Sequence, residues 1–323
     1  MYMKKILITR QLASAYTSIL TAKYDVDIFD SADMAMPRDE LLMRAKGVHG
    51  IVCTLTDTVN QELLDAAGGQ LEVISTMSVG FDHVDTDSLK ERGVRLGYTP
   101  DVLTDSVADI TVALMLVAAR RIPEAISAAK DGEWGTWSPY WLTGHDLSRS
   151  TVGIVGLGAI GVEVAKRLSG FGCTLVYSSR TRKEQLEKEL DLRYVSQDEL
   201  LEQSDVVSVH SALNAETAGL CDANFFAKMK PTAVFVNTSR GGLVDQDALY
   251  DALSNGKIYA AGLDVTTPEP LPTDHPLFSL KNCVILPHIS SASIRTRADM
   301  TRIAVTNLDR ALEGESMEYE VTL

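Results

Sequence analysis

Short apolar runs rich in Ile and Val alternate with stretches of helical periodicity along the whole chain. Continuous apolar runs of this kind are typical of strands that are buried on both faces of a sheet. They predict two series of strands: Lys5–Thr9, Asp25–Phe29, Gly50–Leu55, Glu72–Thr76 and Arg95–Tyr98, then Val152–Gly156, Thr174–Ser178, Val206–His210, Ala233–Asn237, Ala261–Val265 and Val284–Leu286. Helical patterns lie between them, for example at Gln61–Ala67, Ser88–Arg92 and Gly161–Ser169. This alternation predicts an α/β fold with parallel sheets.

Two long helical stretches suggest how the chain divides. Thr104–Ile122 separates the two series of strands and is apolar on most sides, which favours a buried position at a domain boundary. Ser293–Leu312 follows the second series, and we expect it to cover the first sheet. A length of 323 residues suits two domains. We therefore predict a discontinuous domain, residues 1–103 plus 289–323, with a second domain, residues 104–288, inserted into it.

Composition narrows the possible partners and surroundings. The formal net charge of −14 disfavours nucleic acid and anionic membranes, which are themselves negative. The longest apolar run, Val112–Ala119, is too short to span a bilayer. Four widely spaced cysteines show neither a disulfide framework nor metal-ligand spacing. We expect a cytoplasmic protein without a bound metal.

A glycine-rich turn follows the predicted strand that begins near Val152 and precedes a helical run. Its sequence is Gly156-Leu157-Gly158-Ala159-Ile160-Gly161. The first glycine permits a tight turn, the second lets backbone approach a pyrophosphate, and the third lets helix and strand pack closely. The N–H groups of the helix N-terminus would face the phosphates. In this context the motif predicts that the inserted domain binds a dinucleotide.

The next predicted strand ends in the segment Ser179-Arg180-Thr181-Arg182-Lys183. Proteins that bind NAD place an acidic residue there to hold the ribose 2′-hydroxyl. Here Ser179 replaces the acid and three cations follow, which favours a 2′-phosphate and hence NADP(H). The alternative is that these cations are solvated charges at a helix start, although a helix dipole disfavours cations there.

Three polar segments follow the last predicted strands, where ligands of open α/β sheets bind. They contain Arg240, Glu269 and His288. A guanidinium can bind a 2-oxo acid in a planar fork and polarise its carbonyl group. An imidazole can donate a proton to that oxygen, and a neighbouring carboxylate would orient the ring and favour its protonated form. The three residues therefore predict a site for hydride transfer to a small 2-oxo acid.

These segments and the glycine turn resemble the D-2-hydroxyacid dehydrogenase family, and the resemblance covers nearly the whole chain. It is sharpest toward animal glyoxylate and hydroxypyruvate reductases at Ile74–Gly80, Gly97–Asp105 and Leu286–Ile289. The resemblance implies two Rossmann-like domains, the substrate domain being flavodoxin-like, with the active site in the cleft between them. It also implies NADPH-dependent reduction of glyoxylate to glycolate and hydroxypyruvate to D-glycerate. Arg240, Glu269 and His288 would be the catalytic residues.

The resemblance also assigns binding roles and an oligomeric state. Substrate would contact Val79, Gly80, Leu55, Ser291 and Trp137, the last from the partner subunit of a homodimer formed through the cofactor domains. Besides the glycine turn and residues 179–183, the cofactor would contact Ser211, Ala212, Thr238, Ser239, Arg240, Asp264 and Ser290. Ser290 replaces a glycine that is common two residues after the catalytic histidine.

Two alternatives stay open. The same fold serves D-lactate, D-3-phosphoglycerate and formate specificities, although no cation lies near Met77–His83 to hold a phosphate. Relatives of the fold also act as dinucleotide-sensing transcriptional co-regulators without catalytic activity. The missing acid at Ser179 disfavours an NAD sensor, and turnover of a 2-oxo acid would separate the two classes.

Overall fold

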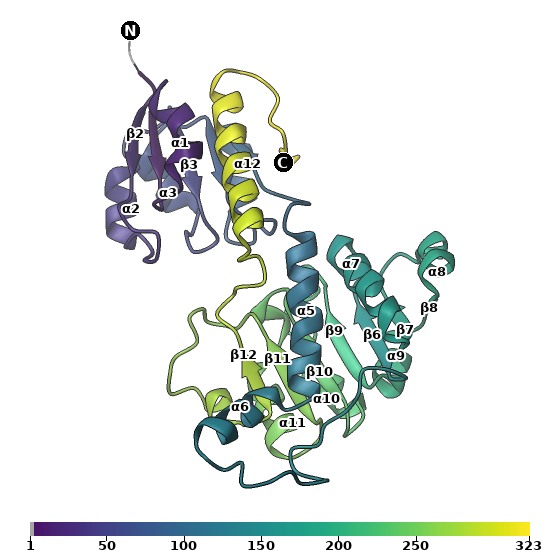
Figure 1. Ribbon diagram of the computed structural model, residues 1–323. Helices are drawn as coiled ribbons and strands as arrows, with labels where there is room; N and C mark the ends of the chain where they lie inside the picture. The colour runs from purple at the N-terminus through teal and green to yellow at the C-terminus, as the bar shows by residue number, and fades with distance from the viewer. Residues whose placement is uncertain (1–2) are drawn as a thin grey trace. The chain divides into compact units, whose positions relative to one another are not determined.

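A computed structural model describes residues 3–323, which form two compact units (Figure 1). The smaller unit comprises the chain up to Leu103 together with Ser293–Leu323, and the larger unit comprises Thr104–Ala292. Each unit is built on its own sheet.

The smaller unit has a five-stranded parallel sheet in the order β2-β1-β3-β4-β5. This is the strand order of flavodoxin-like folds. Its elements are β1 Lys5–Ile8, α1 Ser14–Thr21, β2 Asp25–Ile28, α2 Arg38–Arg44, β3 Gly50–Cys53, α3 Gln61–Ala67, β4 Val73–Thr76, α4 Thr86–Arg92, β5 Arg95–Gly97 and α12 Ile294–Leu312.

The C-terminal helix α12 packs on β3, β4 and β5 of this sheet, as the sequence predicts. It has a strongly amphipathic pattern, and its buried side chains include Met300, Ile303 and Leu308. Leu308 lies so close to Gly50 in β3 that a β-carbon there would approach it to 3.1 Å. The helix is therefore part of the core of the smaller unit rather than an appendage.

The larger unit has a seven-stranded parallel sheet in the order β12-β11-β10-β9-β6-β7-β8. The strands are β6 Thr151–Val155, β7 Thr174–Ser178, β8 Leu192–Tyr194, β9 Val206–Val209, β10 Val234–Asn237, β11 Ala260–Leu263 and β12 Cys283–Ile285. The helices are α5 Thr104–Ala119, α6 Ile122–Lys130, α7 Ala159–Leu168, α8 Glu184–Leu190, α9 Gln197–Gln203, α10 Ala223–Lys228 and α11 Gln246–Ser254. Short 3₁₀ turns are η1 Ser169–Phe171, η2 Gly241–Leu243 and η3 Pro276–Ser279.

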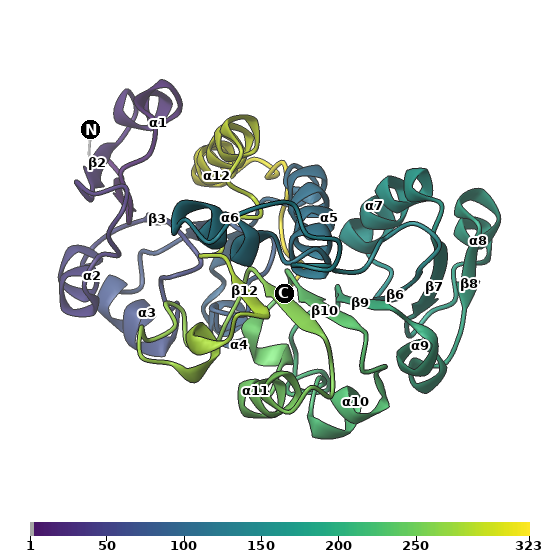
Figure 2. The same ribbon diagram turned by 60° about the horizontal axis from the view of Figure 1, so that its bottom comes forward.

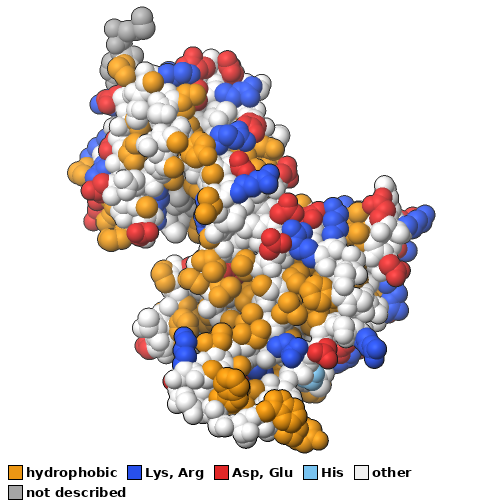
Figure 3. All heavy atoms as spheres, in the orientation of Figure 1, with side chains coloured by type: hydrophobic (Ala, Val, Ile, Leu, Met, Phe, Trp, Pro, Cys, Tyr) orange, Lys and Arg blue, Asp and Glu red, His pale blue; other side chains and the backbone are white. Residues whose placement is uncertain are grey.

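Helices cover both faces of the larger sheet, with α5 and α7 on one face and α9, α10 and α11 on the other (Figure 2). Burial on both faces explains why β9, β10 and β11 consist of buried residues throughout. Hydrophobic side chains also gather on the outer surface over α5, α6 and the loop that follows (Figure 3). The largest exposed side chains in that loop are Trp134, Trp137 and Tyr140.

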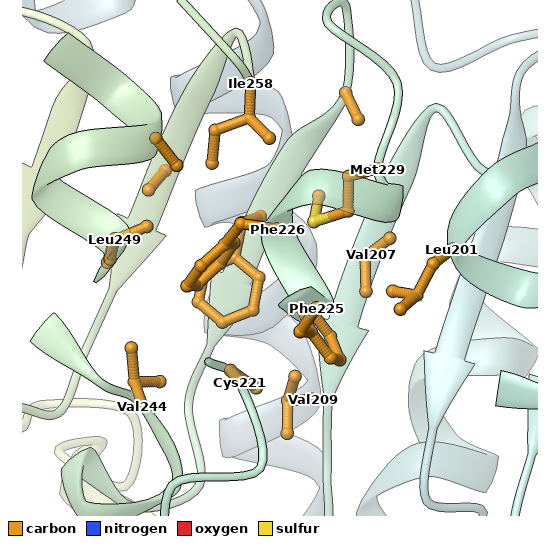
Figure 4. Close-up of a cluster of buried hydrophobic side chains, with 14 of the residues drawn as sticks. Leu201, Val207, Val209, Cys221, Phe225, Phe226, Met229, Val244, Leu249 and Ile258 are labelled. Carbon is orange, nitrogen blue, oxygen red and sulfur yellow. The ribbon is translucent and has the colours of Figure 1, made fainter. Parts of the chain in front are cut away.

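The core on the α9–α11 face contains an aromatic cluster (Figure 4). Phe225 and Phe226 of α10 meet Phe235 of β10 edge to face, with ring centroids 6.1 and 5.2 Å apart. Such edge-to-face pairs add to the stabilisation that burial of the rings provides. This core holds β9, β10 and β11 in place, and these strands lead into most of the segments that the sequence singles out.

Two elements differ from the sequence prediction. The short edge strand β8 was not predicted, because only Leu192 of its three residues is buried and its pattern is too short to recognise. The predicted helical stretch Thr104–Ile122 is divided, since α5 ends at Ala119 and α6 begins at Ile122. Pro123 lacks an N–H and its ring would clash with the preceding turn, and Arg121 accordingly adopts a left-handed φ of 53°.

The larger unit also continues past the predicted boundary at residue 288, as far as Ala292. The amides of Ile289 and Ser290 donate to the Asp264 carboxylate, each at 2.8 Å. The Ser106 hydroxyl in α5 donates to the Ser290 carbonyl oxygen at 2.8 Å. These bonds join residues 289–290 to the larger unit, and α12 begins only after them.

Candidate active site

The segments singled out in the larger unit follow β6, β7, β9, β10, β11 and β12. These strands are neighbours in one parallel sheet, so their carboxyl ends form one edge. The glycine turn follows β6. In the sheet β7 lies on one side of β6 and β9 on the other, so the order in which the chain adds strands reverses at β6. Such a switch point is where open α/β sheets bind ligands.

The glycine turn has the geometry that a pyrophosphate requires. Gly156 has a φ of 94°, and a β-carbon there would lie 2.9 Å from the His210 carbonyl carbon. A β-carbon on Gly161 would lie 2.5 Å from the Gly156 carbonyl oxygen. By contrast, no atom lies within 4 Å of the β-carbon position of Gly158. Since Gly158 also caps α7 without a side-chain bond, the N–H groups of the helix start can approach a phosphate.

The segment after β7 has fewer uncompensated cations than its sequence suggests. Arg182 is held by the Glu187 carboxylate through two bonds of 2.9 and 2.8 Å. The side chain of Arg180 is 87% exposed, and its one ion pair within residues 3–323 is a 3.9 Å pair with Glu216. The Ser179 hydroxyl donates to the Thr181 carbonyl oxygen at 2.6 Å. Arg180 and Lys183 are therefore the cations that could reach an added phosphate.

Hydroxyl groups after β9 and β10 hold the sheet edge together. The Thr238 hydroxyl lies 2.8 Å from that of Thr111 in α5, and Ser239 donates to the Val209 carbonyl oxygen at 2.9 Å. The Ser211 hydroxyl makes one long bond, 3.5 Å, to the Val155 carbonyl oxygen, and Ala212 follows it. The Ser211 and Ser239 hydroxyl groups use their protons in these bonds and keep their acceptor capacity.

Glu269 and His288 lie together, although 18 residues separate them in the chain. His288 Nδ1 is 2.8 Å from Glu269 Oε2. The other carboxylate oxygen accepts from the Thr266 amide at 2.9 Å. Burial alone would raise the pKa of Glu269, but the hydrogen bonds from His288 and Thr266 and the charge of Arg240 hold that pKa below its ordinary value. The carboxylate is therefore ionised at neutral pH.

Asp264 holds the backbone that carries His288. His288 has a left-handed φ of 54°, and its amide donates to the Asp264 carbonyl oxygen at 3.0 Å. The fully buried Asp264 carboxylate accepts the next two amides, those of Ile289 and Ser290. A positive φ is uncommon in residues other than glycine and needs surrounding bonds to maintain it. Asp264 therefore holds the backbone of His288 in place, and the contact with the nicotinamide end of the cofactor that the resemblance implies for Asp264 stays a prediction.

Arg240 leaves β10 through a turn that Asn237 fixes. The fully buried Asn237 side chain donates to the Arg240 carbonyl oxygen at 2.9 Å and accepts from the Ser239 amide at 3.0 Å. Asn237 was not among the predicted site residues, although an Asn at the end of a strand before Ser and Gly is a recognisable turn signal. The turn presents the Arg240 guanidinium close enough to Glu269 for its charge to act on that carboxyl group.

The remaining predicted substrate residues lie in both units. In the smaller unit, Leu55 follows β3 and the pair Val79 and Gly80 follows β4, so all three are at the carboxyl edge of neighbouring strands. In the larger unit Ser291 is buried, whereas the Trp137 side chain is 80% exposed. Among residues 3–323, no cluster of His, Cys, Asp and Glu could hold a metal ion. No helix in that range is long and apolar enough to cross a membrane.

Comparisons with known proteins agree with this geometry. The family model of the D-isomer specific 2-hydroxyacid dehydrogenase NAD binding domain matches residues 112–290. A glyoxylate reductase/hydroxypyruvate reductase of Homo sapiens is 50% identical, over 99% of this chain and 98% of its own length. A glyoxylate reductase of Thermofilum pendens is 44% identical, over 96% and 92% respectively.

Two solved structures share the whole fold. The TT0316 protein of Thermus thermophilus matches with a TM-score of 0.91 and 43% identity, covering 98% of this chain and 100% of that one. An NADPH-dependent glyoxylate/hydroxypyruvate reductase of Sinorhizobium meliloti, in complex with NADP and malonate, matches with a TM-score of 0.85 and 31% identity, covering 99% and 97%. The chain therefore belongs to the D-isomer specific 2-hydroxyacid dehydrogenase family and is an oxidoreductase with a nicotinamide dinucleotide cofactor.

Proposed function

We propose that this protein reduces glyoxylate to glycolate and hydroxypyruvate to D-glycerate with NADPH. The observation that carries the proposal is the pair of Glu269 and His288, 2.8 Å apart, in the same unit as Arg240 and the glycine turn. The 50% and 44% identical relatives that bear the names of these activities support the choice of substrates.

The proton donor that we propose is one nitrogen of His288. When NADPH is bound, its nicotinamide supplies hydride to C2 of the 2-oxo acid. The ionised Glu269 accepts a hydrogen bond from His288 Nδ1, so Nε2 is the nitrogen left to face the substrate. In the imidazolium form Nε2–H donates its proton to the carbonyl oxygen, and the product is the 2-hydroxy acid. The carboxylate then keeps the neutral ring in a single tautomer.

Substrate orientation falls to Arg240 and to residues of the smaller unit. The planar guanidinium of Arg240 would bind the carboxylate and polarise the carbonyl group. In residues 3–323 the amides of Val79 and Gly80 donate to no protein acceptor, so they can hold the substrate carboxylate. Ser291 would lie beside that carboxylate. Leu55 would limit the substituent at C3, which favours glyoxylate and hydroxypyruvate over larger acids.

NADPH is proposed over NADH on the chemistry of the segment after β7. An acidic side chain at Ser179 would repel a 2′-phosphate, and none is present. Arg180 and Lys183 would supply the positive charge. Arg182 is a weaker candidate than the sequence indicated, because Glu187 already neutralises it. We also propose a cytoplasmic location, since all four cysteines are free thiols, as in reducing compartments.

An initial-rate assay that pairs NADPH and NADH with hydroxypyruvate, glyoxylate and pyruvate tests the proposal. We expect NADPH to be preferred, the first two acids to be good substrates and pyruvate to be poor. Efficient use of pyruvate would show that the site does not select the C3 hydroxyl group of hydroxypyruvate; it would not bear on the pocket at Leu55, because pyruvate is the smaller acid. Absence of turnover with every pair would instead favour the co-regulator class of this fold.

The variant Ser179→Asp isolates the cofactor part of that result. It restores the acid that would hold a 2′-hydroxyl and repels a 2′-phosphate, so the preference for NADPH should fall by at least about tenfold. Ser169→Asp in η1 adds the same charge away from this segment and should leave the preference unchanged. Equal preferences in the wild type and Ser179→Asp would show that residues 179–183 do not select the cofactor.

We further propose a homodimer through the cofactor domains, with Trp137 reaching the partner's substrate. Trp134, Trp137 and Tyr140 are 68%, 80% and 85% exposed in the isolated chain. Large apolar side chains that gather on one surface are typical of protein interfaces.

Trp137→Ala is expected to raise the dimer dissociation constant by about tenfold or more and to lower kcat/KM in parallel. Sedimentation equilibrium and steady-state kinetics measure the two effects. Phe278→Ala removes a ring that is 50% exposed elsewhere in the same unit and should change neither quantity. A wild-type protein that sediments as a monomer would rule out this role for Trp137.

A further inference from the structure

We infer that Gln246, the first residue of α11, is a positioning residue that clamps the turn carrying Glu269. The inference rests on the proposed roles of Glu269 and His288. The Gln246 side chain makes two reciprocal bonds with one residue of that turn. Nε2 donates to the Thr267 carbonyl oxygen at 2.6 Å, and Oε1 accepts from the Thr267 amide at 2.8 Å. Both ends of the amide are thus committed to Thr267.

The bonds of the turn itself show why an outside anchor matters. The Thr266 hydroxyl donates to the Pro268 carbonyl oxygen at 2.9 Å, and the Thr266 amide donates to Glu269 at 2.9 Å. Both bonds lie within residues 266–269, so they shape the turn but do not fix its place on the sheet edge. The Gln246 clamp joins the turn to the start of a helix, and it therefore restrains the turn as a whole.

A second contact makes the anchor rigid. A β-carbon on Gly241 would lie 2.0 Å from the Thr266 carbonyl oxygen, so the backbone after Arg240 lies directly against the turn. The segment from Arg240 to Gln246 thus contacts the turn twice, through Gly241 near its start and through Gln246 at its end. Asp245 then caps α11 by accepting the amides of Asp247 and Ala248. The clamp consequently fixes Glu269 relative to the segment that presents Arg240.

This arrangement predicts a specific chemical consequence when the clamp is removed. A turn that moves as a whole keeps its internal bond from the Thr266 amide to Glu269, but the bond between Glu269 and His288 lengthens. The bond to His288 helps to hold the pKa of Glu269 down, so that pKa should rise toward its ordinary value. The Glu269 carboxylate would then become protonated at higher pH than in the wild type, and its orienting bond to His288 would be lost there.

Gln246→Leu tests the inference, with Gln197→Leu as the matched control. Gln197 is also the first residue of a helix in the same unit, after the capping residue Ser196, and its side chain makes no hydrogen bond to any residue from 3 to 323. We expect Gln246→Leu to lower kcat for reduction by about tenfold, with KM for the 2-oxo acid changed by less than about threefold. The acid limb of the pH profile of kcat, where Glu269 becomes protonated, should move to higher pH. Gln197→Leu should leave all three unchanged.

A titration without substrate provides the independent readout. The ¹³C resonance of the Glu269 carboxyl group, assigned by its absence in Glu269→Gln, reports the pKa of that group. We expect a higher pKa in Gln246→Leu than in the wild type and in Gln197→Leu. Because the wild-type pKa is lowered, the bonds to this carboxylate stabilise the fold above the ordinary glutamate range and are lost as pH falls through the lowered value. In Gln246→Leu this stabilisation should be lost at a higher pH than in the wild type, because the pKa of Glu269 is higher.

The possible outcomes separate the inference from the proposed function. An unchanged titration together with an unchanged pH profile would overturn the positioning role, even if the variant were less stable to heat. A wild-type protein that reduces neither acid would refute the proposed function, while the titration would still test the clamp.

Gln246→Glu provides a second variant should Gln246→Leu fold poorly. The introduced carboxylate can accept from the Thr267 amide but cannot donate to the Thr267 carbonyl oxygen. When protonated it can do both, so the kcat ratio of variant to wild type should fall as pH rises through the titration of the new group. A ratio that does not vary with pH would contradict the clamp.

Discussion

Replacement of His288 by Asn is expected to lower kcat for reduction by about two to four orders of magnitude, the usual contribution of a general acid. Nε2 of His288 is the nitrogen that Glu269 leaves free, and among residues 3–323 no other imidazole bonds to that carboxylate. Asn is preferred to Ala because it tolerates the left-handed φ of 54° at this position. Steady-state kinetics measures turnover, and quenching of protein fluorescence by NADPH measures cofactor binding, which should be retained.

A histidine elsewhere in the larger unit serves as the control for this variant. His145 stacks edge to face on Tyr259, with ring centroids 4.5 Å apart, just before β11 and thus at the opposite end of the sheet. His145→Asn should leave turnover unchanged. If His288→Asn kept normal turnover, His288 would not be the proton donor. If it lost NADPH binding as well, the variant would have disrupted the turn that Asp264 holds.

Arg240→Lys is expected to lower kcat/KM for the 2-oxo acid by about a hundredfold. Lysine keeps the charge but cannot present a planar pair of donors, and two charge-assisted hydrogen bonds can account for a loss of this size. The effect should lie mainly in KM for the acid, with a smaller fall in kcat, because the guanidinium binds the ground state and also polarises the carbonyl group. Separate determination of kcat, of KM and of the dissociation constant of NADPH tests this division.

Arg193→Lys on the edge strand β8 provides the matched control, because Arg193 is exposed and bonds only to Gln203 among residues 3–323. It should show wild-type kinetics. An equal rise in the dissociation constant of NADPH and in KM for the acid after Arg240→Lys would assign Arg240 to the cofactor instead. Unchanged kinetics would remove it from the site altogether.

Local sequence was sufficient for a strand with a buried centre and for an amphipathic helix with a clear cap. The strand at Thr174–Ser178 and the helix at Gln61–Ala67 were predicted with the bounds that the structure has. Their apolar patterns, and in the helix the cap at Asn60, are signals that neighbouring residues carry. The edge strand β8 lacked such a signal, because two of its three residues are exposed. It is a strand because it pairs with β7, and that pairing is not visible in its own residues.

The candidate site divides in the same way. Arg240, Glu269 and His288 could be named from the sequence because each stands in a motif just after a predicted strand. The partners that hold them could not. Gln246 reaches Thr267 across 21 residues, and Asp264 reaches Ser290 across 26, so no local pattern records either bond. Arg182 and Glu187 lie only five residues apart, so their ion pair could have been proposed from the sequence. Only the structure shows that Arg182 pairs with Glu187 and not with another carboxylate.

The sequence by itself determined the class of the fold, the glycine turn and the residue types that point to hydride transfer, because hydrophobic periodicity and turn chemistry are properties of neighbouring residues. Only the tertiary structure decided how those residues are held: the 2.8 Å pair of Glu269 and His288, the buried Asp264 beneath the histidine and the Gln246 clamp. Each of these depends on parallel strands that end at one edge of the sheet. That juxtaposition arises from the packing of helices on both faces of the sheet, which no short stretch of the chain specifies.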